Sequence, residues 1–371
     1  MANYENFDFI DTTAKDNEIA AVNKYAELTG IQLQEADPRR IIFKSVAYML
    51  ALAQEVMNDT AKQNFLRFAR DNRLDAKGEL YGTRGKRLAA QPARTTMEFE
   101  ISAAQPVDIV IARGTKISVN ELVFETEEQV KVLKGNVKAR VQAVCTTAGE
   151  VGNGYLPGQI TNIVDLFPYY KAVTNVTETS GGTEIESDER YRERLMEVPE
   201  SFSVAGPSGA YEFWAKSTST DIIDVKALTP EPGHVDVYVW TKYGKPSKEL
   251  QNHVYEVIND RELRPLTDFV HVKEPEIKEY NVELEFYIDK SDEKKASTIK
   301  SNVEATVQEW TEWQKEKLGR DINTDELIHQ LKQAGIKRVD IISPAFTFVE
   351  ENEVAVAKEE IKITFKGAEL E

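Results

Sequence analysis

The residues that could bind a metal ion are few and scattered along the chain. The sequence has four histidines, His234, His253, His271 and His329, and one cysteine, Cys145. No two histidines are three or four residues apart and none is next to the cysteine, whereas metal sites usually show such spacing. Each histidine is therefore better explained as a packed or solvated side chain, and the sequence predicts no metal and no other cofactor.

The residues that could act as a nucleophile or as an acid–base pair also lack the pattern that catalysis needs. No Gly-x-Ser-x-Gly elbow is present. The segment Gly206-Pro207-Ser208-Gly209 is better explained as a helix start with proline in the first turn. Carboxylates are abundant, but a catalytic pair needs a pocket that separates the two pKa values. Runs such as Glu350–Glu353 most simply face solvent, so we predict that the protein is not an enzyme.

A glycine-rich stretch, Gly152 to Gly158, superficially resembles a phosphate-binding loop. Such a loop needs a strand before it and a helix start after it, because the helix amides bind the phosphate. Here Pro157 and the β-rich run Ile160–Val164 follow. The stretch therefore predicts a tight turn between strands.

Composition excludes further classes of function. The chain has 371 residues, which favours two or three domains, and its charge is 46 − 63 = −17. An acidic surface repels phosphate backbones, so no nucleic-acid partner is expected. Cys145 alone cannot form an intrachain disulfide, which fits a reducing cytoplasm. Residues 1–6 lack the pattern of a signal peptide. The apolar stretch Ile41–Met57 contains Lys44 and Glu55, so it predicts a buried amphipathic helix and no membrane anchor.

Hydrophobic periodicity predicts an α+β multidomain protein. Residues 1–92 form a helical region, in which Asp37-Pro38 starts a helix and a second helix carries Phe65, Leu66 and Ala69. Residues 93–186 form a small β-rich domain that includes the junction. The expected strands contain Met97–Ile101, Val107–Ile111, Leu122–Phe124, Val130–Leu133 and Val137–Cys145.

The second half is predicted to contain two α+β modules, at residues 187–275 and 276–371. The first has a helix from Ser187, a short helix over Pro207–Ser217, a strand over Val235–Trp240 and a helix capped by Ser247. The second has a strand over Val282–Ile288, a helix over Ser291–Leu318, a helix capped by Thr324, and strands at Val339–Ile342 and Glu360–Phe365.

The most distinctive segment joins the β-rich domain to the following helix. Its glycines allow backbone conformations that are closed to other residues, and Ser187 is placed to cap a charged helix. Arg190 and Arg194 lie one turn apart and can reach acids on a neighbour; an ordinary capped surface helix is the simpler alternative. The candidate structural junction or interface residues are Gly181, Gly182, Glu186, Ser187, Arg190, Tyr191 and Arg194.

This junction, Gly-Gly-Thr-Glu-Ile-Glu-Ser-Asp-Glu-Arg-Tyr-Arg from Gly181, resembles a signature of the baseplate J-like family of tailed phages and related contractile injection particles. Three earlier segments resemble the same family in the same order. They are Arg73–Arg84 continuing into Ala93–Phe99, Ile111–Lys116 followed by Phe124–Thr126, and Ala148–Gly154. The resemblance covers about residues 70 to 195.

The resemblance implies a structural wedge protein of an inner baseplate, assembled in the bacterial cytoplasm and found in the baseplate of the mature particle. Its implied partners are other copies of itself, a second wedge protein, the sheath initiator and the central hub. The implied role is mechanical, because wedge contacts transmit the trigger for sheath contraction. Two alternatives are a tail-associated cell-wall hydrolase, which would need a catalytic pocket, and a host-binding tail protein, which would favour long β-repeats.

Overall fold

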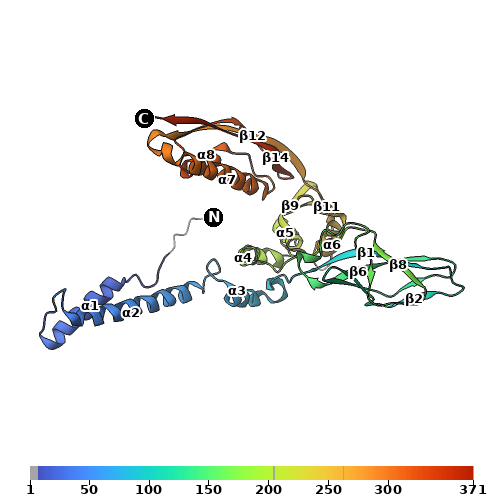
Figure 1. The fold of residues 1–371 in the computed structure, drawn as a ribbon, viewed down its shortest axis with the longest axis horizontal. Helices are drawn as coiled ribbons and strands as arrows, with labels where there is room; N and C mark the ends of the chain where they lie inside the picture. The colour runs from blue at the N-terminus through green and yellow to red at the C-terminus, as the bar shows by residue number, and fades with distance from the viewer. Residues whose placement is uncertain (1–6, 204, 262, 371) are drawn as a thin grey trace. The chain divides into compact units, whose positions relative to one another are not determined.

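A computed structural model describes residues 7–203, 205–261 and 263–370. It confirms the mixed α+β class, with a helical N-terminal region and a central barrel-like sheet (Figure 1). The chain packs into two compact units, the described residues up to Lys86 with Asp188–Leu195, and Arg87–Ser187 with the residues from Met196 onward. No helix in the described part is long and apolar enough to cross a bilayer. The expectation about residues 1–6 lies outside the described residues.

The first unit begins with two helices whose ends are set by local capping. Helix α1 (Ala14–Thr29) starts at Thr13, which forms a capping box with Asp16, and ends at Gly30 in the left-handed conformation. Helix α2 (Pro38–Lys62) starts at Asp37, whose side chain accepts a hydrogen bond from the amide of Arg39. The predicted start at Asp37-Pro38 is therefore confirmed.

The apolar residues of α2 are not buried as predicted. Ala47 is the buried residue of this helix, whereas Ile42, Val46 and Met49 are 65%, 56% and 69% exposed. The periodicity correctly indicated a helix, but α1 packs against a side of α2 other than its apolar face. Periodicity identifies an apolar face without identifying what covers that face.

Residues 63–70 form turns, so the predicted second helix at Phe65, Leu66 and Ala69 is wrong. Helix α3 (Asp71–Gly78) begins directly after these turns and continues into a 3₁₀ segment, Glu79–Gly85. Helix α4 (Asp188–Glu197) holds the turns, because Arg192 donates to the carbonyl oxygens of Leu66 and Ala69. A local sequence pattern cannot predict this long-range contact.

The second unit starts with a six-stranded barrel-like sheet of order β7-β3-β4-β6-β1-β8, accompanied by the pair β2-β5. The strands are β1 (Pro92–Ile101), β2 (Ile109–Ile111), β3 (Lys116–Val119), β4 (Leu122–Thr126), β5 (Val130–Val132), β6 (Lys138–Ala148), β7 (Asn162–Ile163) and β8 (Tyr170–Asn175). All five predicted strands are present, and β7 lies in the predicted β-rich run Ile160–Val164, while β3 and β8 were not predicted. Every second residue of β1 is buried, and Cys145 lies in the same core.

A small α/β module follows, with strands β9 (Ile222–Glu231), β10 (His234–Thr241) and β11 (Phe269–Lys273) in the order β11-β10-β9. Helices α5 (Ser208–Lys216) and α6 (Lys248–Ile258) pack against the sheet. Ser247 caps α6 as predicted, since its side chain accepts a hydrogen bond from the amide of Leu250. This capping fixes the position of α6, whose exposed side borders the site described below.

The last module has the sheet order β13-β12-β14, with strands β12 (Glu276–Asp289), β13 (Arg338–Ser343) and β14 (Glu353–Glu369). Figure 1 shows helices α7 (Ala296–Lys315) and α8 (Thr324–Gln333) on one face of this sheet. The predicted helix from Ser291 is shorter than expected, because Lys290–Lys295 is a 3₁₀ segment. Asn323, not Thr324, caps α8.

Candidate functional site

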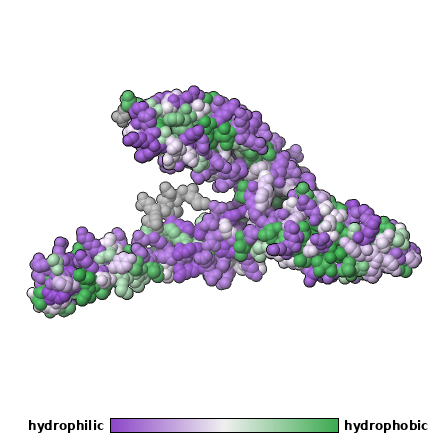
Figure 2. Space-filling view, in the orientation of Figure 1, coloured by the Kyte–Doolittle hydropathy of each residue, from purple (hydrophilic) through white to green (hydrophobic). Residues whose placement is uncertain are grey.

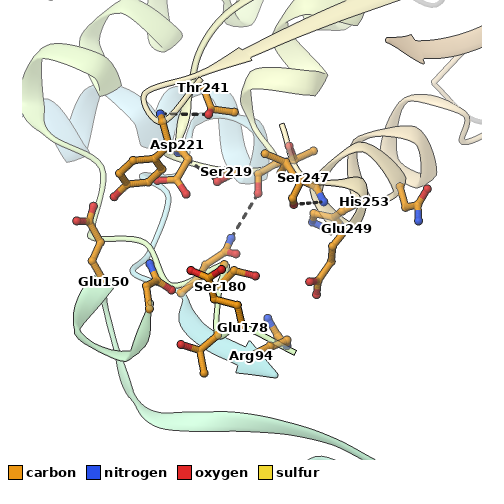
Figure 3. Close-up of a pocket in the computed structure, with 18 of the residues that line it drawn as sticks. Arg94, Glu150, Glu178, Ser180, Ser219, Asp221, Thr241, Ser247, Glu249 and His253 are labelled. Carbon is orange, nitrogen blue, oxygen red and sulfur yellow. Dashed lines mark hydrogen bonds between the residues drawn. The ribbon is translucent and has the colours of Figure 1, made fainter. Parts of the chain in front are cut away.

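An open cleft of about 840 Å³, lined mostly by polar residues, lies within the second unit (Figure 3). One wall comes from turns of the barrel-like sheet at Asn153, Gly154 and Glu178–Gly181. The other comes from the loops around β9 and β10 and from the exposed side of α6. The cleft therefore brings together segments that are far apart in the sequence.

The barrel wall is fixed by hydrogen bonds between two turns. Asn153 donates to the carbonyl oxygen of Gly182 at 2.7 Å and accepts from the Gly182 amide at 2.9 Å. The amide of Gly154 donates to the carbonyl of Thr179. The glycine-rich stretch connects two strands, β6 and β7, but this connection is longer than the predicted tight turn, and Asn153 binds it to Gly182.

The two walls are joined by an ion cluster centred on Lys242. Its ammonium binds Glu150 on the barrel side and lies 2.9 Å from Asp221 on the other. Burial disfavours the charge on Lys242, but the hydrogen bonds to Glu150 and Asp221 outweigh it and raise its pKa. The hydrogen bond from Lys242 in turn lowers the pKa of Glu150. Lys242 and Glu150 are therefore both charged at neutral pH, and their ion pair favours a fixed spacing of the walls.

The remaining charge in the cleft is mostly negative. Glu178, Glu249 and Glu256 line it, and within the described residues none of the three has a basic partner within ion-pair distance. The lining also includes Arg94, which pairs with Glu127 at 3.1 Å, and Lys245, which pairs with Glu274. The cleft therefore carries excess negative charge.

Among the described residues of the cleft, His253 and Ser247 do not form a hydrogen bond with each other. Both residues line the cleft, but in the described chain His253 makes no hydrogen bond to a serine or a carboxylate. The hydroxyl of Ser247 instead caps α6. A nucleophile–base pair requires such a hydrogen bond. No group of three His, Cys, Asp or Glu side chains among residues 7–203, 205–261 and 263–370 could hold a metal ion.

Gly181 and Gly182 are required at the junction for different physical reasons. Gly181 lies at φ +83°, a conformation that other residues resist, as predicted for one of the pair. Gly182 has no positive φ, but a Cβ there would lie 2.4 Å from the carbonyl oxygen of Gly149. Gly182 is therefore required by close packing and not by its backbone angles.

Glu186 is buried and forms hydrogen bonds within the second unit. It is 4% exposed; its carboxylate accepts from the amide of Leu88, and its carbonyl accepts from the Arg87 guanidinium at 2.8 Å. Ser187, next in the chain, precedes α4 and is exposed. These contacts join Glu186 to Arg87 and Leu88, a few residues before β1.

Three other candidates belong to α4 in the first unit. Tyr191 is 1% exposed and its hydroxyl donates to the carbonyl of Gly85 at 2.5 Å. Arg194 is 5% exposed and donates to the carbonyls of Arg84 and Lys86. Arg190 is half-buried. Tyr191 and Arg194 thus hold the 3₁₀ segment of their own unit, and a contact between Arg194 and acids on a partner does not fit its burial.

Two segments of the chain match descriptions of known protein families. Residues 96–182 match the family description "Baseplate J-like protein barrel domain", and residues 203–274 match "Baseplate J-like central domain". The two segments correspond to the barrel-like sheet and to the module with β9–β11. The polar cleft is lined by residues of both.

One curated relative and one solved structure also resemble parts of this chain. "Baseplate protein J" of Escherichia phage P2 is 28% identical over 190 residues, which are 50% of this chain and 61% of that protein. The chain thus matches less than two thirds of the length of that relative. A chain in a cryo-EM structure of the anti-feeding prophage baseplate is 10% identical with a TM-score of 0.43, covering 92% of this chain and 90% of that one.

Proposed function

Because this chain belongs to the baseplate J-like family, we propose that it is a structural component of the baseplate of a contractile tail. The supporting observation is that the barrel and central domains of the family both match, in that order. In the proposed role, copies of the chain join each other and a second wedge protein in the inner ring around the hub, beside the sheath initiator. The protein is assembled in the bacterial cytoplasm and ends in the baseplate of the particle.

The exposed side of α2 supports a role in assembly. Ile42, Val46, Met49, Ala53 and Val56 recur at alternating spacings of four and three residues, and all are exposed. Figure 2 shows hydrophobic surface over α1 and α2. An apolar stripe with this spacing is the pattern that pairs one helix with another, and a continuous exposed patch usually marks an interface. The proposed partner of α2 is a helix of a neighbouring wedge chain.

The proposed mechanism is mechanical and uses no cofactor. Contacts between wedges hold a closed arrangement, and a trigger from the fibres shifts those contacts so that the sheath can contract. The energy for such a change comes from differences in contact between the two arrangements. Partners, rather than a bound small molecule, then define the function.

We expect the lone protein to be a monomer or a small oligomer. Its 17 excess negative charges oppose close association of identical copies unless a specific interface outweighs them. Ring-sized species should form when the second wedge protein or the hub is co-expressed. Light scattering of the lone protein, and then of the co-expressed pair, measures this directly.

Stable rings from the lone protein at micromolar concentration and moderate salt would contradict this partner-dependent assembly. A pair that never associates would contradict the wedge role itself. Raising the salt concentration serves as a control, because it screens the repulsion and separates a charge effect from a missing partner.

We also expect no hydrolase activity. The basis is the absence, among the described residues of the cleft, of a hydrogen-bonded nucleophile and base. Assays on peptidoglycan and on model esters should show no turnover above background. A measured rate that is lost when one carboxylate of the cleft, such as Glu178, is changed to glutamine would refute the purely structural role.

A further inference from the structure

The outer edge of β14 is open in the last module. β14 ends the sheet β13-β12-β14 and pairs in parallel with β12 from Glu276↔Glu353 to Asp289↔Glu369, with register shifts after Ala357 and after Phe365. In the described part of the chain no strand lies on its other side. A strand at the end of a sheet presents a row of N–H and C=O groups that can pair with another extended backbone. At 17 residues, β14 is much longer than an ordinary edge strand.

A groove of about 460 Å³ lies between α7 and β14. On the helix side it is lined by Val307, Gln308 and Thr311, and on the strand side by residues that include Ile361 and Ile363. The groove thus runs next to the strand that ends the sheet.

The hydrophobic core is incompletely closed along this groove. Ile361 and Ile363 pair with Val282 and Leu284 of β12, so the four side chains lie on the same face of the sheet. Val282 and Leu284 are 1% and 0% exposed, whereas Ile361 and Ile363 are only half-buried. An additional strand beside β14 would cover these isoleucines as β14 covers the residues of β12.

Three carboxylates and two lysines line the groove, so its net charge is small. Glu312 pairs with Lys315 at 2.6 Å, and Glu304 lies 3.9 Å from Lys300. Lys358 and Glu359 add one charge of each sign. The groove therefore offers apolar contacts and backbone hydrogen bonds, and it does not select a strongly charged ligand.

We propose that β14 accepts an extended segment of a partner protein as a fourth strand of the sheet. Side chains alternate along a strand, so every second residue of that segment would enter the groove and should be apolar. The backbone hydrogen bonds would supply affinity and the groove would supply selectivity. The source of the segment, a neighbouring protein of the baseplate, rests on the function proposed above.

A partner segment fits this site better than a second copy of the chain. Twelve residues line the groove, whereas a stable interface between two folded chains uses about 20–30 residues on each side. The net charge of −17 further opposes pairing of identical chains. A short segment from a protein already held in the same assembly needs little contact area, because its effective concentration is high.

Hydrogen–deuterium exchange tests the proposal on the free protein and on the protein in complete particles. We expect peptides from residues 353–369 to exchange at least tenfold more slowly in the particle, because the outer amides of β14 become paired. Fast exchange in particles that contain the protein would overturn the inference and leave the proposed function intact. Absence of the protein from the particles would overturn both. Protection that grows with the concentration of the lone protein would identify a second copy as the occupant and refute the partner segment.

A variant that fills the groove provides the second test. Gln308 is exposed and lines the groove, so Gln308→Trp adds bulk there without entering the core. Asn302→Trp is the matched control, because Asn302 is an exposed amide on the same helix outside the groove lining.

Both variants should have the melting temperature of the wild type. Gln308→Trp should lose the slow exchange of residues 353–369 in particles or reduce incorporation at least tenfold, and the control should not. Equal protection and incorporation of both variants would overturn the proposal.

Discussion

Replacing Gly182 with alanine is expected to destabilise the barrel-like sheet by about 3 kcal/mol, near the upper end of typical overpacking costs. The added Cβ would lie 2.4 Å from the carbonyl oxygen of Gly149 and 2.9 Å from Oδ1 of Asn153. Backbone cannot move aside as a flexible side chain can, so the turn must shift and strain its hydrogen bonds to Asn153. Native-state hydrogen exchange of β1 and β6 measures the free energy of opening in the full chain.

Gly181→Ala is the matched control for this prediction. Gly181 has a positive φ but open space around its Cβ position, so only backbone strain of about 1 kcal/mol is expected. A larger loss at Gly181 than at Gly182 would show that backbone strain, and not close packing, decides the choice of glycine at this junction.

The double change Val46→Glu with Met49→Glu is expected to weaken incorporation into baseplates at least about hundredfold. Burial of each side chain in a helical interface is worth roughly 1.5–3 kcal/mol, and two such losses exceed the 2.8 kcal/mol that corresponds to this factor. Both residues are more than half exposed in the lone chain, so its melting temperature should change little. Quantitative co-purification with particles measures the effect.

Lys44→Glu is a suitable control, since it changes the net charge by the same two units on another side of the same helix. Lys44 is exposed and does not belong to the apolar stripe. Equal losses for the two variants would mean that charge alone controls assembly. Full incorporation of the double variant would rule out α2 as a contact helix.

Features with a local physical cause were predicted well from the sequence. Asp37 and Ser247 cap helices through hydrogen bonds to amides two or three residues away, so the sequence alone indicates them. The alternation of Met97, Phe99 and Ile101 likewise indicated a strand with one buried face.

Features that depend on distant partners could not be predicted. The local pattern at residues 63–70 predicts a helix, whereas the observed turns are held by Arg192, more than a hundred residues later. The polar cleft depends on Lys242 meeting Glu150, which is 92 residues away. The apolar stretch of α2 was interpreted as buried, because a period of 3.6 residues describes a face and not its environment.

The division of the chain has a consequence for how it withstands force and cleavage. The polypeptide crosses between its two units at Lys86–Arg87, at Ser187–Asp188 and again at Leu195–Met196. A pulling force applied between the units is therefore divided among three crossings, and two of these are held in the first unit by the hydrogen bonds of α4. A protease that cuts one connection leaves two intact. Removing the residues before Arg87 would also leave Tyr191 and Arg194 without the carbonyl groups that they bind, so the helical region cannot be treated as a detachable appendage.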